Sequence, residues 1–511
     1  NNSSRFGKWL QVIVSNGCAI KSCSVTDYLL ELTRVCKQGP NERSYHVFFQ
    51  MLAAGGDLGK DVVFMEPQQY NYIKHSQHNA PGIDDKQDFE MLRAALGALG
   101  FSGEVQHEIF RVAMGVLTLG NVEFCEEGEG CRIKDSTPAR DAAGLVGVPF
   151  EDLQRSLVAR RLKVGRDVTK ALRRPMQAEH ARDSLARLLY GRLFKFLVAR
   201  INDVLSEGAD MQGQYFGILD IAGFESFDVN SIEQLSINLS NEHLQSHFNN
   251  HIFKMELEDY EAEGIDSVAT LTYQDNADII ALLDSRASVL SVLDEEVSVP
   301  KANDDTFHAK ICRNFAQHAR FIAPRFSGSR QFGVRHFAGN VTYTADHFLE
   351  KNVDTPPDEA PALCMASSLK VLEDIGGVIE QEIIEASAPG KRKTRTVSSS
   401  FRSSLASLMR TLSEAEPHFI RCIKPNQLKA AGSFQAPMVM DQLKCSGVFE
   451  AVRIRQSGFS SRIAFRDFLL RYRIVVPRMT ARQIRQDLDG GRCQIDCVKD
   501  FCKALPDALS V

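Results

Sequence analysis

Two short segments, far apart in the sequence, carry the residue types that phosphate chemistry needs. The first is Asn2-Ser3-Ser4-Arg5-Phe6-Gly7-Lys8, and the second is Asp220-Ile221-Ala222-Gly223-Phe224-Glu225. A site that hydrolyses a nucleoside triphosphate must hold Mg²⁺, contact the γ-phosphate and orient a water molecule. Serine hydroxyls and a carboxylate suit Mg²⁺, which prefers hard oxygen ligands. The two segments together therefore predict two walls of a nucleotide site.

The spacing within the second segment assigns its residues different tasks. Asp220 follows the apolar run 215–219, which predicts a carboxylate at the end of a buried strand. Gly223 has no side chain, so its backbone N–H can approach a phosphate oxygen. Arg5 and Glu225 can form an ion pair that exists in only one state of the site. By composition alone, Asn-Ser-Ser is also a common turn, and Asp-x-x-Gly is also a common strand-to-turn junction.

In their extended forms, the two segments resemble switch I and switch II of the myosin motor domain. Kinesins have related switches, but they continue Ser-Ser-Arg with Ser-His and read Asp-Leu-Ala-Gly-Ser-Glu in the second switch. The residues Phe6-Gly7-Lys8 and Phe224-Glu225 therefore favour myosin over a kinesin-like microtubule motor. Further segments that resemble myosins follow in order at 41–48, 233–253, 293–307, 336–343, 348–352, 417–426 and 445–450.

The resemblance implies an α/β fold: a myosin motor core of the P-loop NTPase type, with a mixed central sheet and large helical insertions, truncated at both ends. It implies an actin-activated ATPase that couples hydrolysis of ATP with Mg²⁺ to force on actin filaments. The implied location is the cytoplasmic actin cytoskeleton. A light chain or calmodulin would bind a lever arm beyond this chain.

The resemblance also implies a role for each switch residue. Ser3 would lie near the γ-phosphate and the attacking water, Ser4 would ligate Mg²⁺, and Asn2 would support the loop. Gly223 would donate its N–H to the γ-phosphate, and Asp220 would hold the water shell of the metal. The residues implied in catalysis are Ser3, Gly223, Arg5 and Glu225.

The glycine-rich loop that cradles phosphates in such enzymes does not occur in this sequence. Gly7-Lys8, Gly59-Lys60 and Gly390-Lys391 each lack the Gly-x-x-x-x-Gly-Lys-Ser/Thr frame. We therefore expect the phosphate-binding floor to precede Asn1 and the fragment to show no ATPase activity. The alternative is an actin-binding module or pseudo-motor that has no turnover.

The resemblance divides the chain into four parts. Residues 1–205 would form the upper half of an actin-binding cleft with switch I, and they read as mostly helical. Residues 206–420 would hold the switch II strand, the relay helix and the lower half of the cleft. Residues 421–458 would contain a core strand and thiol-type helices, and 459–511 a partial converter. Helical spacing predicts helices at 27–34, 88–99 and 178–202, and the resemblance places a sheet strand at 417–426.

Two basic segments are candidates for contacts with actin. Residues 160–170 and 389–400 have the composition of solvated surface loops, and in myosins loops at these places touch actin. The helix-loop-helix at 293–307 resembles a third actin contact. Asp167 matches a family position where an acidic or phosphorylatable residue supports activation, so no phosphorylation would be needed. The implied actin-binding residues are Arg160, Arg161, Asp167, Lys301, Lys391, Arg392, Lys393 and Arg395.

Composition sets broader bounds. The 511 residues, with 44% apolar and 24% charged side chains, are typical of a soluble globular protein of three to four compact units. The net charge of −5 argues against a nucleic-acid partner, and no apolar run is long enough for a transmembrane segment. The twelve dispersed cysteines suit reduced thiols in a cytosol.

Two clusters invite a metal interpretation. His243, His247 and His251 share one helix face, but the third is about 12 Å from the first along the axis. We therefore favour a relay-helix face over a zinc site. The spacing of Cys493, Cys497 and Cys502 is not a zinc pattern either.

Overall fold

A computed structural model provides the structure of the chain. It describes residues 5–15, 19–28, 30–39, 42–55, 64–80, 82–164, 167–206, 214–262, 275–324, 326, 328–353, 359–386, 396–426, 430–449, 452, 456 and 463–505. The contacts divide the chain into two compact units. The first contains residues 1–245 and 276–420, and the second contains 246–275 and 421–511.

A three-stranded antiparallel sheet joins the two segments that the sequence singled out. Its order is β2 (Ile20–Tyr28), β1 (Gly7–Val14) and β7 (Gln214–Asp220). The first pair is a local hairpin, whereas β7 joins from far along the chain and places Asp220 opposite Lys8. Trp9 is 5% exposed and packs on this sheet. The antiparallel pairing thus brings the start of β1 beside the end of β7.

Two expectations about these strands were wrong. The helix predicted at 27–34 is instead the end of β2 followed by the short 3-10 helix η1 (Leu32–Val35). Pairing with β1 outweighs the local helical pattern there. The strand before Asp220 is not buried, since Phe216 and Ile218 on β7 are about half exposed. In the described part of the chain β7 is an edge strand, which explains the exposure.

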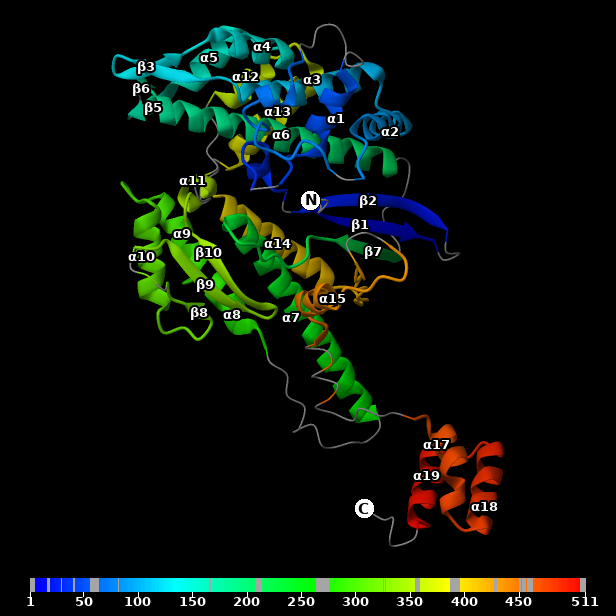
Figure 1. The fold of residues 1–511 in the computed structure, drawn as a ribbon. Helices are drawn as coiled ribbons and strands as arrows, with labels where there is room; N and C mark the ends of the chain where they lie inside the picture. Colours follow the sequence, from blue (N-terminus) through cyan, green and yellow to red (C-terminus); the bar gives the residue numbers. More distant parts are fainter. Residues whose placement is uncertain are drawn as a thin grey trace. The chain divides into compact units, whose positions relative to one another are not determined.

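A helical layer forms the largest core of the first unit (Figure 1). The helices α2 and α3 begin at side-chain caps, where Asp84 accepts from Lys86 N–H and Ser102 accepts from Val105 N–H. The prediction of a helix at 88–99 is confirmed by α2, and that at 178–202 by α6. The members of the layer are α1 (His46–Ala54), α2 (Asp85–Ala98), α3 (Gly103–Leu119), α4 (Ser136–Val146), α5 (Phe150–Val158), α6 (Pro175–Leu205), α12 (Ala360–Met365) and α13 (Lys370–Ala386).

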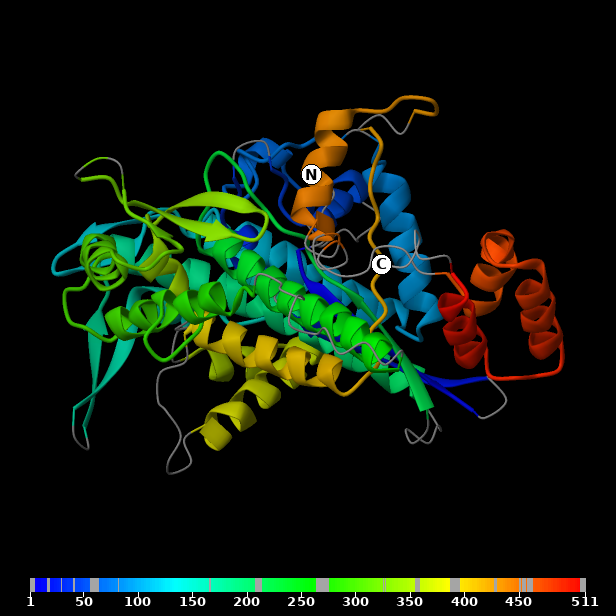
Figure 2. The ribbon, with the colours of Figure 1, turned by 90° about the horizontal axis from the view of Figure 1, so that it is seen from below.

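Two β-hairpins extend from this layer. The first pairs β3 (Phe124–Glu127) with β4 (Gly130–Ile133), and the second pairs β5 (Ala159–Val164) with β6 (Asp167–Leu172). The second hairpin corrects the expectation of a loop at 160–170, and Figure 2 shows it reaching out from the helices. Residues 162, 164 and 168 are Leu and Val, which favour strands, and Val164 pairs with Asp167 across a short connection.

The remainder of the first unit packs helices around a second three-stranded sheet of order β10-β9-β8. Four buried aromatic rings pack against one another within its core, by stacked and edge-to-face contacts: Phe307, Phe332, Tyr343 and Phe348. The elements are α7 (Ile232–Ala262, which continues into the second unit), α8 (Ala277–Leu283), α9 (Val289–Val297), α10 (Asp304–Phe315), β8 (Phe321–Ile322), β9 (Gln331–His336), β10 (Gly339–Thr344), α11 (Phe348–Asn352) and α14 (Val397–Ser413).

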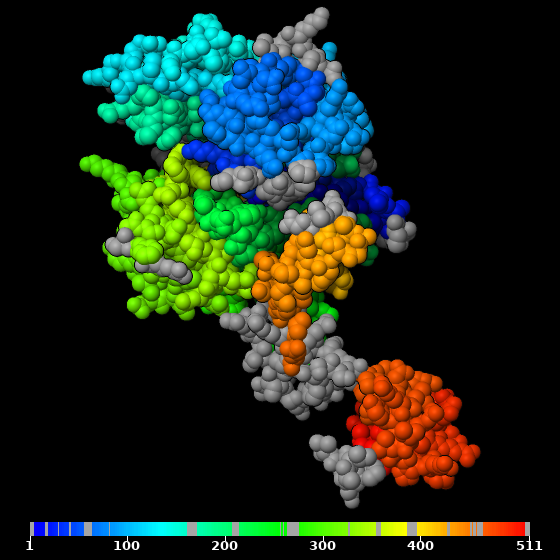
Figure 3. All heavy atoms as spheres, viewed as in Figure 1, coloured from blue at the N-terminus to red at the C-terminus, as the bar shows by residue number. Residues whose placement is uncertain are grey.

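The second unit contains α15 (Ala436–Cys445) and a group of three short helices. These are α17 (Phe465–Tyr472), α18 (Arg478–Asp489) and α19 (Gln494–Lys503), and they form one continuous body of atoms in Figure 3. Their core includes Leu469, Leu488 and Phe501. Residues 417–426 contain no strand, which corrects the implied core strand. No described strand pairs with them, and a strand needs a hydrogen-bonded partner.

Three absences hold within the described residues. No helix there is both long and apolar enough to cross a membrane. No group of three His, Cys, Asp or Glu side chains in that part could hold a metal ion, which includes the three histidines on α7. The cysteines that the structure describes carry free thiols.

Candidate functional site

The structure brings Arg5 and Glu225 together. The register that sets Lys8 opposite Asp220 leads the chain before β1 toward the segment after β7. The Arg5 Nη1 donates to both Glu225 carboxylate oxygens, at 3.0 and 3.3 Å. Both residues are 8% exposed, so the ion pair is buried.

Arg5 faces more than one carboxylate. Its guanidinium also lies 3.5 Å from a carboxylate oxygen of Glu31 and 3.5 Å from one of Glu42. Arg34 balances these acids, donating to Glu31 at 2.9 Å and to Glu42 at 2.8 Å. We call the five side chains Arg5, Arg34, Glu31, Glu42 and Glu225 the latch cluster.

Burial changes the acid–base properties of Glu31 in the latch cluster. Burial raises the pKa of the Glu31 carboxyl by more than the neighbouring Arg34 and Arg5 lower it. Glu31, Glu42 and Arg34 were not among the predicted site residues. The only local signal concerned Glu31 and Arg34, whose spacing of three residues indicates an ion pair within one helical turn.

The backbone of Glu225 is held by α7. The side-chain amide of Asn238 accepts from Glu225 N–H at 2.8 Å and donates to the Glu225 carbonyl at 2.7 Å. Gln234, one turn earlier on the helix, donates to the Glu225 carboxylate at 3.2 Å. A movement of Glu225 therefore requires a movement of the start of α7 or the loss of these bonds.

A buried polar chain continues from Asn238 into the second sheet. Asn238 donates to the Tyr343 hydroxyl at 2.9 Å, and that hydroxyl lies 2.8 Å from His336 Nε2. The other ring nitrogen of His336 lies 2.8 Å from the Glu242 carboxylate on α7. Phe224 packs edge-on against the His336 ring. The segment after β7 is thus tied to β9, β10 and α7 together.

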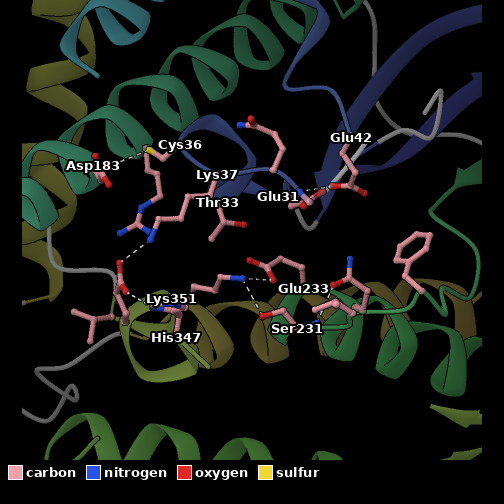
Figure 4. A pocket seen from close by; sticks show the side chains of 18 of the residues that line it. Glu31, Thr33, Cys36, Lys37, Glu42, Asp183, Ser231, Glu233, His347 and Lys351 are labelled. Carbon is pink, nitrogen blue, oxygen red and sulfur yellow. Dashed lines mark hydrogen bonds and ion pairs between the residues drawn. The ribbon is translucent and has the colours of Figure 1, made fainter. Parts of the chain in front are cut away.

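A cavity of 1140 Å³ adjoins the latch cluster (Figure 4). Glu31, Thr33 and Lys37 line one wall, and Ser231 and Glu233 line the other. Figure 4 shows the walls facing each other, with residues of α6 such as Asp183 also lining the cavity.

Lys351 of α11 fixes the second wall. Its ammonium donates to Glu233 and to Ser231 at 2.9 Å each. Burial would raise the pKa of Glu233, but Lys351 at this distance outweighs it together with further hydrogen bonds, so the pKa of that carboxyl is lowered. The residue before Lys351, Glu350, accepts from Lys37 at 3.3 Å, which links the two walls.

Gly223 and Asp220 face open space. No atom lies within 4 Å of the position that a Cβ on Gly223 would take. The Asp220 carboxylate is about half exposed, with Lys8 as its ion-pair partner at 3.5 Å. An exposed glycine three residues after an accessible carboxylate fits one edge of a magnesium–nucleotide site. Asn2, Ser3 and Ser4, the other predicted members, lie outside the described residues.

The predicted actin-binding residues fall into three groups. Arg160 is exposed at the base of the β5–β6 hairpin, and Arg161 and Asp167 lie on its strands. Lys301 is exposed in the connection between α9 and α10, with a positive φ of 66°. The basic residues Lys391, Arg392, Lys393 and Arg395 lie outside the described residues.

Comparisons with known proteins cover almost the whole chain. The family model described as "Myosin head (motor domain)" matches residues 1–503. The chain is 35% identical to "Myosin heavy chain, non-muscle" of Drosophila melanogaster, over 100% of this chain and 25% of that protein. It is 38% identical to "Myosin-14" of Arabidopsis thaliana, over 94% of this chain and 32% of that protein. The chain thus spans about a quarter to a third of the length of these relatives.

Proposed function

Because the chain belongs to the myosin motor-domain family, we propose that it is the part of an actin-based ATPase motor that carries both switch segments. The observation that supports this proposal best is the buried ion pair between Arg5 and Glu225, which joins the two switch segments. Closing and opening of this pair would report the state of the γ-phosphate to the rest of the molecule.

In this proposal each switch residue has a defined task. Ser4 and the Asp220 carboxylate would hold Mg²⁺ and its water shell, while Ser3 and the Gly223 N–H would contact the γ-phosphate, with Asn2 as support. Bound Mg-ATP would supply the phosphoanhydride bond whose hydrolysis drives the motor. The Arg5–Glu225 pair would close the site and exclude water from its far side.

The contacts of Glu225 supply a route for coupling. Asn238 holds both backbone polar groups of Glu225, so a shift of the switch would be passed to α7. The cavity beside the latch cluster gives the two walls room to approach each other. Actin filaments would be the partner, and a light chain or calmodulin would bind a lever arm of the longer protein. The motor would work on the cytoplasmic actin cytoskeleton.

The second candidate function is actin binding without turnover. The β5–β6 hairpin carries Arg160 and Asp167, and the α9–α10 connection carries Lys301. Neither surface contains a residue predicted for the nucleotide site. The phosphate-loop motif does not occur in these 511 residues. We therefore propose that this chain by itself has no steady-state ATPase activity.

Cosedimentation with actin filaments separates the two functions. A motor whose switches respond to nucleotide releases filaments when ATP is added, whereas a module stays bound. Actin-activated phosphate release by the purified 511-residue chain would contradict the proposed lack of turnover.

The Gly223→Ala variant tests the nucleotide contact. Its Cβ meets no atom, so stability should stay within about 0.5 kcal/mol of the parent. In a longer protein that contains the phosphate loop, we expect the same substitution to lower ATP turnover at least tenfold, because the methyl group would lie where the phosphate approaches. Unchanged turnover would argue against a phosphate contact at Gly223.

A further inference from the structure

The stretch 468–486 in the second unit is strongly basic. It contains five arginines and no acidic residue, although the whole chain has a net charge of −5. It covers most of α17, the 3-10 helix η5 (Arg473–Val475) and the larger part of α18. All five side chains are exposed: Arg471, Arg473, Arg478, Arg482 and Arg485.

None of these five arginines forms an ion pair with a described residue. Three acids of the same three-helix group pair with other arginines, since Asp487 and Asp500 pair with Arg492 and Asp489 pairs with Arg466. The other two acids described there, Asp467 and Asp496, form no ion pair with the five arginines. The positive charge of the stretch is therefore not neutralised within the part of the unit that the structure describes.

Two large apolar side chains protrude within the same stretch. Ile474 of η5 is 85% exposed, and Met479 at the start of α18 is 81% exposed. Each has an arginine beside it in the chain, Arg473 and Arg478 respectively. The core of the three-helix group is filled by other residues, including Leu469, Ile484 and Phe501. Neither protruding side chain contributes to that core.

From these observations we propose that the connection between α17 and α18 docks on an anionic membrane surface. Ile474 and Met479 insert among the lipid headgroups, while the surrounding arginines attract acidic lipids. Isolated apolar side chains that project from a basic surface fit a bilayer interface, which needs no matching groove. An acidic protein partner would offer charge, but it would need a complementary pocket for each apolar side chain. The inference does not depend on the proposed motor function, because neither ATP nor actin takes part.

Vesicle cosedimentation of the 511-residue chain tests the proposal. We expect binding to vesicles of phosphatidylcholine with 30% phosphatidylserine and little binding to phosphatidylcholine alone. Each basic residue near an anionic surface contributes roughly a fivefold gain in affinity, so Arg473→Glu with Arg478→Glu should weaken binding by at least about 25-fold.

Matched variants identify the surface. Lys499→Glu with Lys503→Glu makes the same change of charge on α19 and should weaken binding far less. Lys391→Glu with Lys393→Glu makes the same change of charge in the basic segment 389–400. Ile474→Ser with Met479→Ser keeps the charge and should abolish the binding that remains in 0.5 M salt, where electrostatic attraction is screened.

Three results would overturn the proposal. The first is that Lys499→Glu with Lys503→Glu weakens vesicle binding as much as Arg473→Glu with Arg478→Glu does. The second is that only Lys391→Glu with Lys393→Glu weakens vesicle binding. The third is that Arg473→Glu with Arg478→Glu leaves vesicle binding unchanged. In the last case the basic stretch would be left as a surface for an acidic protein. Because all substituted side chains on η5 and α18 are exposed, far-UV circular dichroism of each variant should match that of the parent.

Discussion

Removal of Arg5 should destabilise the first unit more than removal of its partner charge on Glu225. In Arg5→Met, three carboxylates lose a guanidinium that lies 3.0 to 3.5 Å away. Breaking a buried ion pair by deleting one member costs about 3–5 kcal/mol, because the other charge stays buried without compensation. In Glu225→Gln, the amide still accepts from Arg5, and Arg5 keeps Glu31 and Glu42. Loss of one charge-assisted hydrogen bond costs about 1.5–3 kcal/mol.

The single tryptophan supplies a local assay. Trp9 lies on β1, four residues after Arg5, and is 5% exposed, so its fluorescence in a urea titration reports unfolding of the sheet that carries the latch cluster. The double variant should be more stable than the sum of the two losses predicts, by about 1–3 kcal/mol, since the residues contact each other.

Lys8→Met is the matched control on the same strand. The Lys8–Asp220 pair is about half exposed, and an exposed pair contributes at most about 1 kcal/mol. The reasoning fails if Arg5→Met shifts the Trp9 transition no more than Lys8→Met does, or if the effects of Arg5→Met and Glu225→Gln simply add.

Four further predictions follow from single contacts. Lys351→Met should destabilise the first unit at pH 7, because Lys351 stabilises the ionised Glu233 carboxylate. The pKa of Glu233 is lowered in the folded state, so this stabilisation is present above its unfolded pKa and is lost as pH falls through the folded one. The difference in stability between Lys351→Met and the parent should therefore shrink at acidic pH, and a pH-independent difference in the Trp9 transition would contradict this. Asn238→Ala should cost about 2–4 kcal/mol and speed hydrogen exchange at the Glu225 amide, whereas Asn340→Ala at an exposed strand position should do neither. Gly217→Ala should lower the free energy of unfolding by about 1–3 kcal/mol and shift Trp9 emission, because the new methyl group would overlap the Trp9 ring. If this variant and Gly223→Ala were equally stable, the contact between Gly217 and Trp9 would not be tight. Burial raises the pKa of the Cys36 thiol to about 12, so at pH 8 only about 10⁻⁴ of this thiol is ionised to thiolate. Iodoacetamide should therefore label the exposed Cys493 at least about a hundredfold faster than Cys36, as measured by mass-spectrometric mapping.

The motifs alone determined which chemistry to look for. Arg5 and Glu225 were predicted to meet because their segments matched two switches, and helices such as α2 and α6 followed from apolar spacing and clear starts. Such signals are local, so a window of a few residues contains them. The same local reasoning failed at 27–34 and at 160–170, where pairing between strands decided the conformation.

Only the tertiary structure decided how the latch is built. Glu31, Glu42 and Arg34 join it because the chain after β2 turns back beside Arg5. The spacing of Glu31 and Arg34 indicates that they pair with each other, but not that they contact Arg5. Asn238 forms hydrogen bonds with the backbone of Glu225 because α7 packs against the segment after β7. A motif specifies the type of side chain at a site. The burial, the charge partners and the coupling of that side chain depend on which distant strands pair, as β1 and β7 do here.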